Sequence, residues 1–162
     1  MPQQAEESRA AGYAAAAEVC LLDQHGRSHR LADYNGRSIV IYFYPKDATP
    51  GCTVEGKEFR DLHEQFTALD CLIFGVSTDG VESHRAFAEK HAFPFTLLAD
   101  TAGELARTLG VLNGTVARRV TFVIGKDGRV ARTFENVAPR GHAQQVLNFV
   151  RTLRESHLMI GG

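Results

Sequence analysis

Three short, almost continuous apolar runs constrain the fold of this chain more than any other feature. They are SIVIYFY (38–44), CLIFGV (71–76) and VTFVI (120–124), and they are rich in Ile, Val, Phe and Tyr. Runs of this length and composition are typical of strands buried on both faces of a sheet. We expect a weaker strand at 95–99, a return strand at 129–134 after the KDG turn, and a short hairpin that turns at 24–26.

Helical periodicity separates these runs. Glu55, Phe59, Leu62, Phe66 and Leu69 recur at intervals of three and four residues, which predicts a single helix of roughly 17 residues after Cys52, about 25 Å long. Further helices are expected over 81–91, 102–109 and 143–153. Strands that alternate with helices predict an α/β sheet covered on both faces. We interpret 1–15 as a loose N-terminal tail and 16–162 as a single domain.

Composition narrows the function classes. The chain has 162 residues, 44% hydrophobic and 23% charged content, and a net charge of −1, which argues against nucleic-acid or membrane-surface binding. No apolar run approaches the roughly 20 residues needed to span a bilayer. Cys20, Cys52 and Cys71 lack CxxC spacing, which indicates free thiols in a reducing compartment and hence a cytoplasmic protein. No histidine and cysteine spacing suggests a metal site, and we expect no cofactor.

The segment YFYPKDATPGCTVE (42–55) carries the strongest chemical signal. Pro45 cannot donate to a sheet ladder and therefore ends the strand, while Thr49 and the following Pro-Gly form the loop and cap that open a helix. Cys52 then falls in the first helical turn, where unpaired N–H groups favour a thiolate over a thiol. Thr49, the Cys52 N–H and a nearby arginine could stabilise the oxyanion that leaves when a thiolate attacks a peroxide.

These residues resemble a known family. The pattern Pro45-x-x-x-Thr49-x-x-Cys52 matches the active-site signature of peroxiredoxins, and the surrounding segment is similar to the bacterioferritin comigratory protein or peroxiredoxin Q branch. Further similar segments lie at 21–37, 74–79, 93–100 and 119–130, so the resemblance covers about 18–153. It implies a thioredoxin-like fold of the peroxiredoxin type, with an N-terminal hairpin and a central mixed sheet flanked by helices.

The resemblance also implies an activity and residue roles. A thiol-dependent peroxidase of this kind reduces hydrogen peroxide and organic hydroperoxides in antioxidant defence and redox homeostasis, by way of a sulfenic acid on Cys52. Thr49 would hydrogen-bond the sulfur and the peroxide, and Pro45 would shield the pocket from water. Arg119 would hold the thiolate, with Glu55 steering its guanidinium and Tyr44 supporting the pocket. Alternation with Thr121 and Phe122 favours Arg119 over Arg118, which would be the next candidate.

One departure from the branch bears on the reaction cycle. Many members carry a resolving cysteine five residues after the first, where this chain has Lys57, and the predicted helix at 81–91 contains none. We therefore expect no resolving cysteine, with Cys20 and Cys71 as weak candidates and an external thiol as reductant: thioredoxin, glutaredoxin or glutathione. The resemblance is compatible with a monomer or a weak homodimer.

Two other functions fit parts of the pattern. A cysteine hydrolase would need a histidine base beside Cys52, such as His63. A redox-sensing or chaperone-like binding module would use the same fold without turnover. The joint presence of proline, threonine, cysteine and arginine favours the peroxidase over both. We expect His63 and His84, which lie on predicted helices, to be solvated side chains.

Overall fold

The computed structural model describes residues 12–161, and the side chains among them up to 155. A seven-stranded sheet runs through the centre in the order β2-β1-β5-β4-β3-β8-β9. Its strands are β1 (Cys20–Asp23), β2 (Ser28–Arg30), β3 (Ser38–Phe43), β4 (Cys71–Ser77), β5 (Thr96–Ala99), β8 (Val120–Ile124) and β9 (Val130–Phe134). A separate two-stranded sheet pairs β6 (Leu112–Asn113) with β7 (Val116–Ala117).

The sheet is mixed because two kinds of connection join its strands. β3, β4 and β5 are parallel, and parallel neighbours require long crossovers. Two helices, α2 (Pro50–Asp61) and α3 (His63–Ala68), lead from β3 to β4, and α4 (Val81–His91) leads from β4 to β5. β8 returns antiparallel beside β3, so that Phe43 pairs with Val120. β9 forms one edge of the sheet, and the β1–β2 hairpin lies at the other edge, with β2 outermost.

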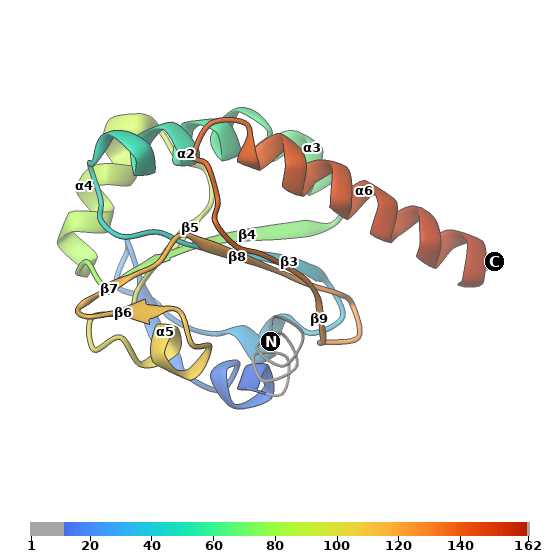
Figure 1. The fold of residues 1–162 in the computed structure, drawn as a ribbon, viewed down its shortest axis with the longest axis horizontal. Helices are drawn as coiled ribbons and strands as arrows, with labels where there is room; N and C mark the ends of the chain where they lie inside the picture. Colours follow the sequence, from blue (N-terminus) through green and yellow to red (C-terminus); the bar gives the residue numbers. More distant parts are fainter. Residues whose placement is uncertain (1–11, 162) are drawn as a thin grey trace.

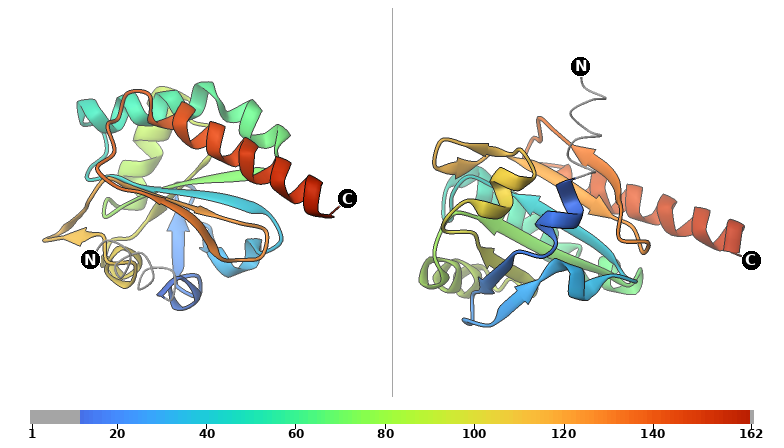
Figure 2. Two further views of the ribbon diagram at one scale, coloured as in Figure 1. Left: turned by 45° about the vertical axis from the view of Figure 1, so that its right-hand side comes forward. Right: turned by 90° about the horizontal axis from the view of Figure 1, so that it is seen from below.

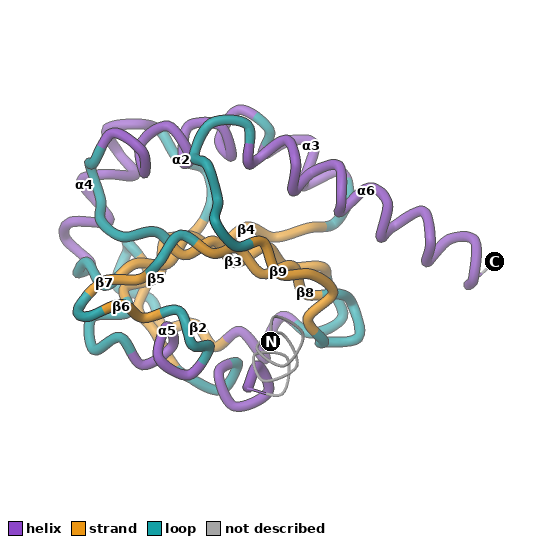
Figure 3. The backbone as a smooth tube through the Cα atoms, viewed as in Figure 1, coloured by secondary structure: helices purple, strands orange, loops and turns teal. Residues whose placement is uncertain are grey.

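Helices cover both faces of the sheet (Figures 1 and 3). One face carries α2, α3, α4 and α6 (His142–Gly161), and the other carries α5 (Glu104–Thr108) and the first described residues. β3 serves both cores because successive side chains point to opposite faces. Tyr42 joins the core that contains Phe59 of α2, whereas Ile41 and Phe43 join the core that contains Leu105 of α5.

The helix expected after Cys52 is in fact two helices. The chain leaves helical geometry at Leu62, with φ −99° and ψ 2°, between α2 and α3. Phe59 and Phe66 remain buried on the two sides of this break, so the apolar stripe continues across it. Periodicity alone therefore joined two elements that the backbone separates.

The packed part of the chain also includes residues before position 16, the expected start of the domain. Residues 12–16 are helical, and Tyr13 is only 2% exposed because it packs into the core that contains Leu105 and Leu109. Of the predicted tail, 12–15 therefore belong to the packed domain, and 1–11 lie outside the described residues. A short 3-10 helix, η1 (Leu31–Tyr34), and the β6–β7 hairpin were not predicted.

The last helix is longer than its apolar pattern indicated. α6 runs from His142 to Gly161, and its C-terminal half extends beyond the sheet and away from the rest of the domain (Figure 2). Within the part of the chain that the structure describes, no helix is both long and apolar enough to cross a membrane.

Candidate active site

Cys52 lies where β3 gives way to α2. Loop 44–49 follows the strand, Thr49 occupies the N-cap position in an extended conformation, and Pro50 begins the helix. Pro at the first helical position is favoured because its missing N–H would have no partner there. Cys52 is 2% exposed and sits in the first turn. The sulfur therefore lies at a helix terminus, which carries unpaired N–H groups and a partial positive charge.

Arg119 reaches Cys52 from the neighbouring strand. It directly precedes β8. Because Val120 pairs with Phe43, Arg119 lies at the end of β3 from which the chain continues into α2. Its Nη2 lies 3.3 Å from the Cys52 Sγ, and its Nη1 donates to Glu55 Oε1 at 2.7 Å. Arg118 points elsewhere and donates to the Gly110 carbonyl at 2.8 Å. The planar guanidinium thus bridges the sulfur and a carboxylate.

Glu55 and Arg119 form an ion pair in which the pKa of both groups is raised. Glu55 is fully buried, its Oε2 has no hydrogen-bond partner, and burial raises its pKa to about 7 against the opposing charge of Arg119. Burial alone would lower the pKa of Arg119, but the charge of Glu55 and the hydrogen bond to Cys52 outweigh it and raise that pKa. The guanidinium therefore stays cationic while the carboxyl group can titrate near neutrality.

The other predicted site residues lie on the loop before the helix. The Thr49 hydroxyl donates to the Lys46 carbonyl at 2.8 Å, so the expected hydrogen bond from Thr49 to the sulfur is not made in this structure. Its oxygen remains able to accept a hydrogen bond. The Tyr44 hydroxyl donates to Asp47 Oδ1 at 2.6 Å inside the core. Pro45 is half-buried at the start of the loop.

Gly51, Pro139 and His142 also lie near the site, and the sequence pattern predicted a place there only for Gly51. A Cβ at Gly51 would lie 3.2 Å from Arg119 Nη2 and 3.3 Å from Pro139 Cγ, so glycine lets both side chains approach the start of α2. His142 is buried, and its Nε2 lies 2.8 Å from the Thr121 hydroxyl. Burial, and to a lesser extent the charge of Arg119, lower the pKa of His142 to about 4. No local pattern links Pro139 or His142 to Cys52, which lies far from both in the sequence.

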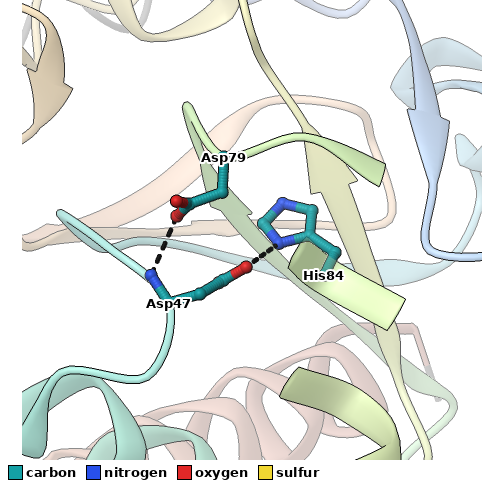
Figure 4. A group of neighbouring side chains, drawn as sticks. All are labelled: Asp47, Asp79 and His84. Atoms are coloured by element: carbon teal, nitrogen blue, oxygen red, sulfur yellow. Dashed lines mark hydrogen bonds and ion pairs between the residues drawn. The ribbon is translucent and has the colours of Figure 1, made fainter. Parts of the chain in front are cut away.

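The prediction that His84 is solvated is wrong. His84 is completely buried, and its Nδ1 lies 2.7 Å from Asp47 Oδ2, as Figure 4 shows. The partner that makes burial possible precedes it by 37 residues, so helical periodicity could not reveal it. His63 is half-buried, and burial lowers its pKa.

Neither histidine serves Cys52 as a base. Among the described residues the sulfur bonds to Arg119, and no imidazole nitrogen there contacts it. The cysteine hydrolase therefore lacks its essential contact. Asp47, Asp79 and His84 bring ligand atoms within 4.8 Å of one another, but these atoms are already engaged in hydrogen bonds to protein groups. A cation would have to displace those bonds.

The three cysteines are well separated in the fold. Cys71 pairs with Ser38 at the start of β3, about 16 Å along the sheet from the end where the Cys52 loop begins. Cys20 is exposed on β1, which lies three strand spacings from β3, or about 14 Å. A disulfide requires Cα atoms within about 7 Å. The strand register supports this separation better than the predicted helix length, since that helix is interrupted.

Comparison with known proteins shows the family of this chain. A sequence profile of the AhpC/TSA family matches residues 13–133. Peroxiredoxin Bcp of Bacillus subtilis is 41% identical over 148 residues, which cover 86% of this chain and 94% of that protein. A chloroplastic peroxiredoxin Q of Sedum lineare is 40% identical over 138 residues, covering 83% of this chain and 74% of the relative.

Solved structures extend the agreement to the fold. Xanthomonas campestris peroxiredoxin Q superposes with a TM-score of 0.84 at 35% identity, covering 87% of this chain and 94% of its own. Mycobacterium tuberculosis BcpB gives a TM-score of 0.77 at 35% identity, covering 83% of this chain and 92% of its own. These matches confirm the predicted thioredoxin-like fold with its central mixed sheet. The chain therefore belongs to the AhpC/TSA family, in the branch formed by Bcp and peroxiredoxin Q.

Proposed function

We propose that this protein, a thiol-dependent peroxidase by family, reduces hydrogen peroxide and small organic hydroperoxides through a one-cysteine cycle at Cys52. The observation that carries the proposal is the Arg119 guanidinium, which donates to the Cys52 sulfur and to Glu55 at once. The guanidinium thus places a cation beside the proposed nucleophile, the Cys52 sulfur, at the N-terminus of α2. Such an arrangement stabilises negative charge both on the attacking sulfur and on the leaving oxygen.

The first half of the cycle breaks the O–O bond. The Cys52 thiolate attacks one peroxide oxygen, forms an S–O bond and releases the other oxygen as hydroxide or alkoxide. That anion takes a proton from solvent to leave as water or alcohol, and the cysteine is left as a sulfenic acid. The Thr49 hydroxyl and the Cys52 N–H orient the peroxide, and Pro45 limits access of water.

The second half uses a thiol from outside the chain. A first external thiol condenses with the sulfenic acid, releasing water and leaving a mixed disulfide, and a second thiol then releases Cys52. The position of Cys71 supports this, because its thiol is 2% exposed and burial raises its pKa to about 12. Thioredoxin, glutaredoxin and glutathione are the reductants that we propose.

The proposed range of substrates rests partly on the activity named for a relative. The Xanthomonas campestris bacterioferritin comigratory protein, 34% identical with a TM-score of 0.84, is described as having alkyl peroxide reduction activity. We extend organic hydroperoxides to this chain on that basis. Three free cysteines suit a reducing compartment, and we propose that the protein acts in the cytoplasm as a monomer or a weak homodimer.

Substitution of Cys52 tests the proposal. We expect Cys52→Ser to abolish peroxide consumption in the presence of excess dithiothreitol, whereas Cys20→Ser, at an exposed position, should behave like the parent. Single-turnover mixing with hydrogen peroxide and with cumene hydroperoxide, followed by mass spectrometry, measures oxidation at each cysteine. Activity that survives in the Cys52→Ser protein would refute the assignment.

A further inference from the structure

We propose that His84 and Asp47 are positioning residues for the peroxidase reaction, because their buried hydrogen-bond network holds the loop that aims Cys52 at Arg119. The inference rests on the proposed role of Cys52 and adds a pair that does not touch the sulfur. Asp47 lies in the 44–49 loop, and His84 lies on α4, which crosses over from β4 to β5 (Figure 4). Their side chains are 3% and 0% exposed.

The loop contains a backbone conformation that needs support. Ala48 has φ 64°, in the left-handed region, which costs a residue with a Cβ about 1–2 kcal/mol. Ala48 stands between Asp47 and the N-cap residue Thr49, so its turn sets the direction in which α2 leaves the loop. A strained residue of this kind persists where its surroundings hold the chain on both sides.

Asp47 supplies that hold through both its side chain and its backbone. Its Oδ1 accepts from the Tyr44 hydroxyl at 2.6 Å, and its Oδ2 accepts from the Ser83 hydroxyl at 2.8 Å and faces His84 Nδ1 at 2.7 Å. Its N–H donates to Asp79 Oδ2 at 2.8 Å. The residue before the left-handed turn is thereby tied to the ends of β3 and β4 and to the first turn of α4.

His84 makes the network depend on one proton. Its Nε2 lies 2.9 Å from the Leu98 carbonyl, which only accepts, so this nitrogen must carry a hydrogen. Its Nδ1 faces a carboxylate oxygen, and one further proton must lie between these two atoms. An amide in place of the carboxylate carries no charge and offers one acceptor oxygen, whereas both carboxylate oxygens of Asp47 have hydrogen-bond partners, so the charge-assisted bond to Nδ1 becomes a weaker neutral one. The weakened network holds the left-handed turn at Ala48 less firmly, so we expect the loop to move.

The chain contains a matched control for this pair. Asp23 and His29 form a second contact between a carboxylate and an imidazole, partly buried and 2.6 Å long, and His29 Nδ1 also bonds to the hydroxyl of Tyr34. This second group belongs to the β1–β2 hairpin and η1, and β5 and β4 separate it from β3. Asp23→Asn therefore repeats the chemical change of Asp47→Asn away from the Cys52 loop.

Two replacements of His84 separate positioning from mere stability. Gln can place its amide nitrogen where Nε2 lies and keep the bond to Leu98, whereas Asn can place its nitrogen where Nδ1 lies and keep the bond to Asp47. Both shrink the same buried side chain. We expect His84→Gln and Asp47→Asn to slow single-turnover oxidation of Cys52 by about 10- to 100-fold, His84→Asn by less than about 5-fold, and Asp23→Asn not at all.

Two further measurements address the loop directly. Alkylation of Cys52 by iodoacetamide needs no peroxide turnover, so a changed rate in Asp47→Asn and His84→Gln reports on the loop even where the peroxidase assignment fails. Hydrogen exchange of residues 46–53 should quicken in the same two variants and stay unchanged in Asp23→Asn. If His84→Gln and His84→Asn are slowed equally, or if Asp23→Asn is slowed as much as Asp47→Asn, the proposal is wrong.

A milder variant keeps the test available if these proteins fail to fold. Ser83 is exposed, and Ser83→Ala removes one of the donors to Asp47 while leaving the pair with His84. We expect a 2- to 5-fold slower oxidation of Cys52, in proportion to the smaller disturbance, with faster exchange in the 44–49 loop. Parent-like rates in Ser83→Ala together with unchanged exchange would contradict the network's role.

Discussion

At the scale of single residues, the proposed chemistry of Cys52 depends on the guanidinium of Arg119. It is 17% exposed and contacts both the sulfur and a fully buried carboxylate. We predict that Arg119→Ala lowers the second-order rate of Cys52 oxidation by about 100- to 1,000-fold, the usual effect of removing a donor that stabilises developing negative charge. Stopped-flow measurement with hydrogen peroxide checks this rate.

The neighbouring arginine provides the control for that measurement. Arg118→Ala removes an exposed side chain that bonds to the Gly110 carbonyl, and its oxidation rate should match that of the parent. Arg119→Lys should recover little of the lost rate, because an ammonium group cannot hold the sulfur and Glu55 in one plane. Equal rates in the Arg118→Ala and Arg119→Ala proteins would show that the contact between Arg119 and the Cys52 sulfur does not contribute to catalysis.

Glu55 gives a prediction about stability and pH. Burial raises its pKa from 4.5 to about 7, so between these values the folded protein keeps a proton that the unfolded chain releases. The free energy of unfolding should therefore fall as the pH rises through this window and should level off above it. Glu55→Gln lacks this titration, so its stability relative to the parent should improve from pH 4.5 to 7 by up to about 3 kcal/mol.

Urea denaturation of the parent and of Glu55→Gln at several pH values tests the sign. The Glu55→Gln protein also loses the charged partner of Arg119. This loss changes its free energy of unfolding by the same amount at every pH, so the difference in slope between the two stability curves still reports the titration of Glu55. Two stability curves that stay parallel from pH 4.5 to 7 would show that Glu55 titrates at its ordinary pKa.

At the scale of elements, the position of α2 is set by a glycine that faces an aromatic ring. A Cβ at Gly56 would lie 2.5 Å from the Phe93 ring, which is closer than real contacts allow. That ring is itself held by Phe87, edge-on at 5.0 Å, and by Phe95, stacked at 5.2 Å. Helix α2, which carries Cys52, therefore cannot move closer to the Phe93 ring. A larger side chain at position 56 must push α2 away from that ring.

We predict that Gly56→Ala destabilises the protein by about 1–3 kcal/mol, the usual cost of overpacking a well-filled core. It should also slow Cys52 oxidation, because α2 moves relative to Arg119. Thermal unfolding and single-turnover kinetics measure the two effects. Adding Phe93→Leu should restore part of both, since it removes the ring that the new methyl group meets.

A second glycine serves as the control at this scale. Gly80 precedes α4 with an ordinary φ of −84°, and a Cβ there would meet nothing within 4 Å. Gly80 is the N-cap residue of α4, so Gly80→Ala should cost only the N-cap preference of glycine over alanine, about 0.5–1 kcal/mol. A Gly56→Ala protein as stable as Gly80→Ala would mean that the aromatic cluster yields and does not fix the helix.

At the scale of the whole molecule, the sheet keeps the three cysteines apart. The register places Cys71 level with Ser38 at one end of β3, while Cys52 follows the other end. We predict that the double variant Cys20→Ser, Cys71→Ser turns over hydroperoxide with glutathione or thioredoxin at the parent rate. Coupled assays with each reductant measure this, and non-reducing gels follow any disulfide.

An intramolecular partner would leave a clear trace in these experiments. A peroxide-dependent band that disappears in Cys20→Ser or Cys71→Ser, together with lost turnover, would establish a two-cysteine cycle. Loss of activity with thioredoxin alone, and not with glutathione, would identify the reductant and leave the one-cysteine cycle intact.

Much of the fold follows from local patterns. The apolar runs at 38–44, 71–76 and 120–124 became β3, β4 and β8, because continuous burial on both faces requires apolar residues at every position. The break at Leu62 left no such mark, since neither glycine nor proline accompanies it and the apolar stripe persists. The burial of Tyr13 left no mark in the sequence either, because a single aromatic residue among alanines shows no period and its burial depends on α5.

The sequence by itself determined the position of Cys52, since Pro45 ends the strand and the residues from Thr49 open a helix with Cys52 in its first turn. It also indicated Arg119, through the alternation of side chains along β8. Only the tertiary structure decided what surrounds these groups: that Thr49 bonds to Lys46, that Asp47 receives His84, and that Cys71 lies far from Cys52. The physical reason is range. Strand and helix periods act over a few residues, whereas a buried hydrogen bond joins whichever groups packing brings together, however distant in the chain.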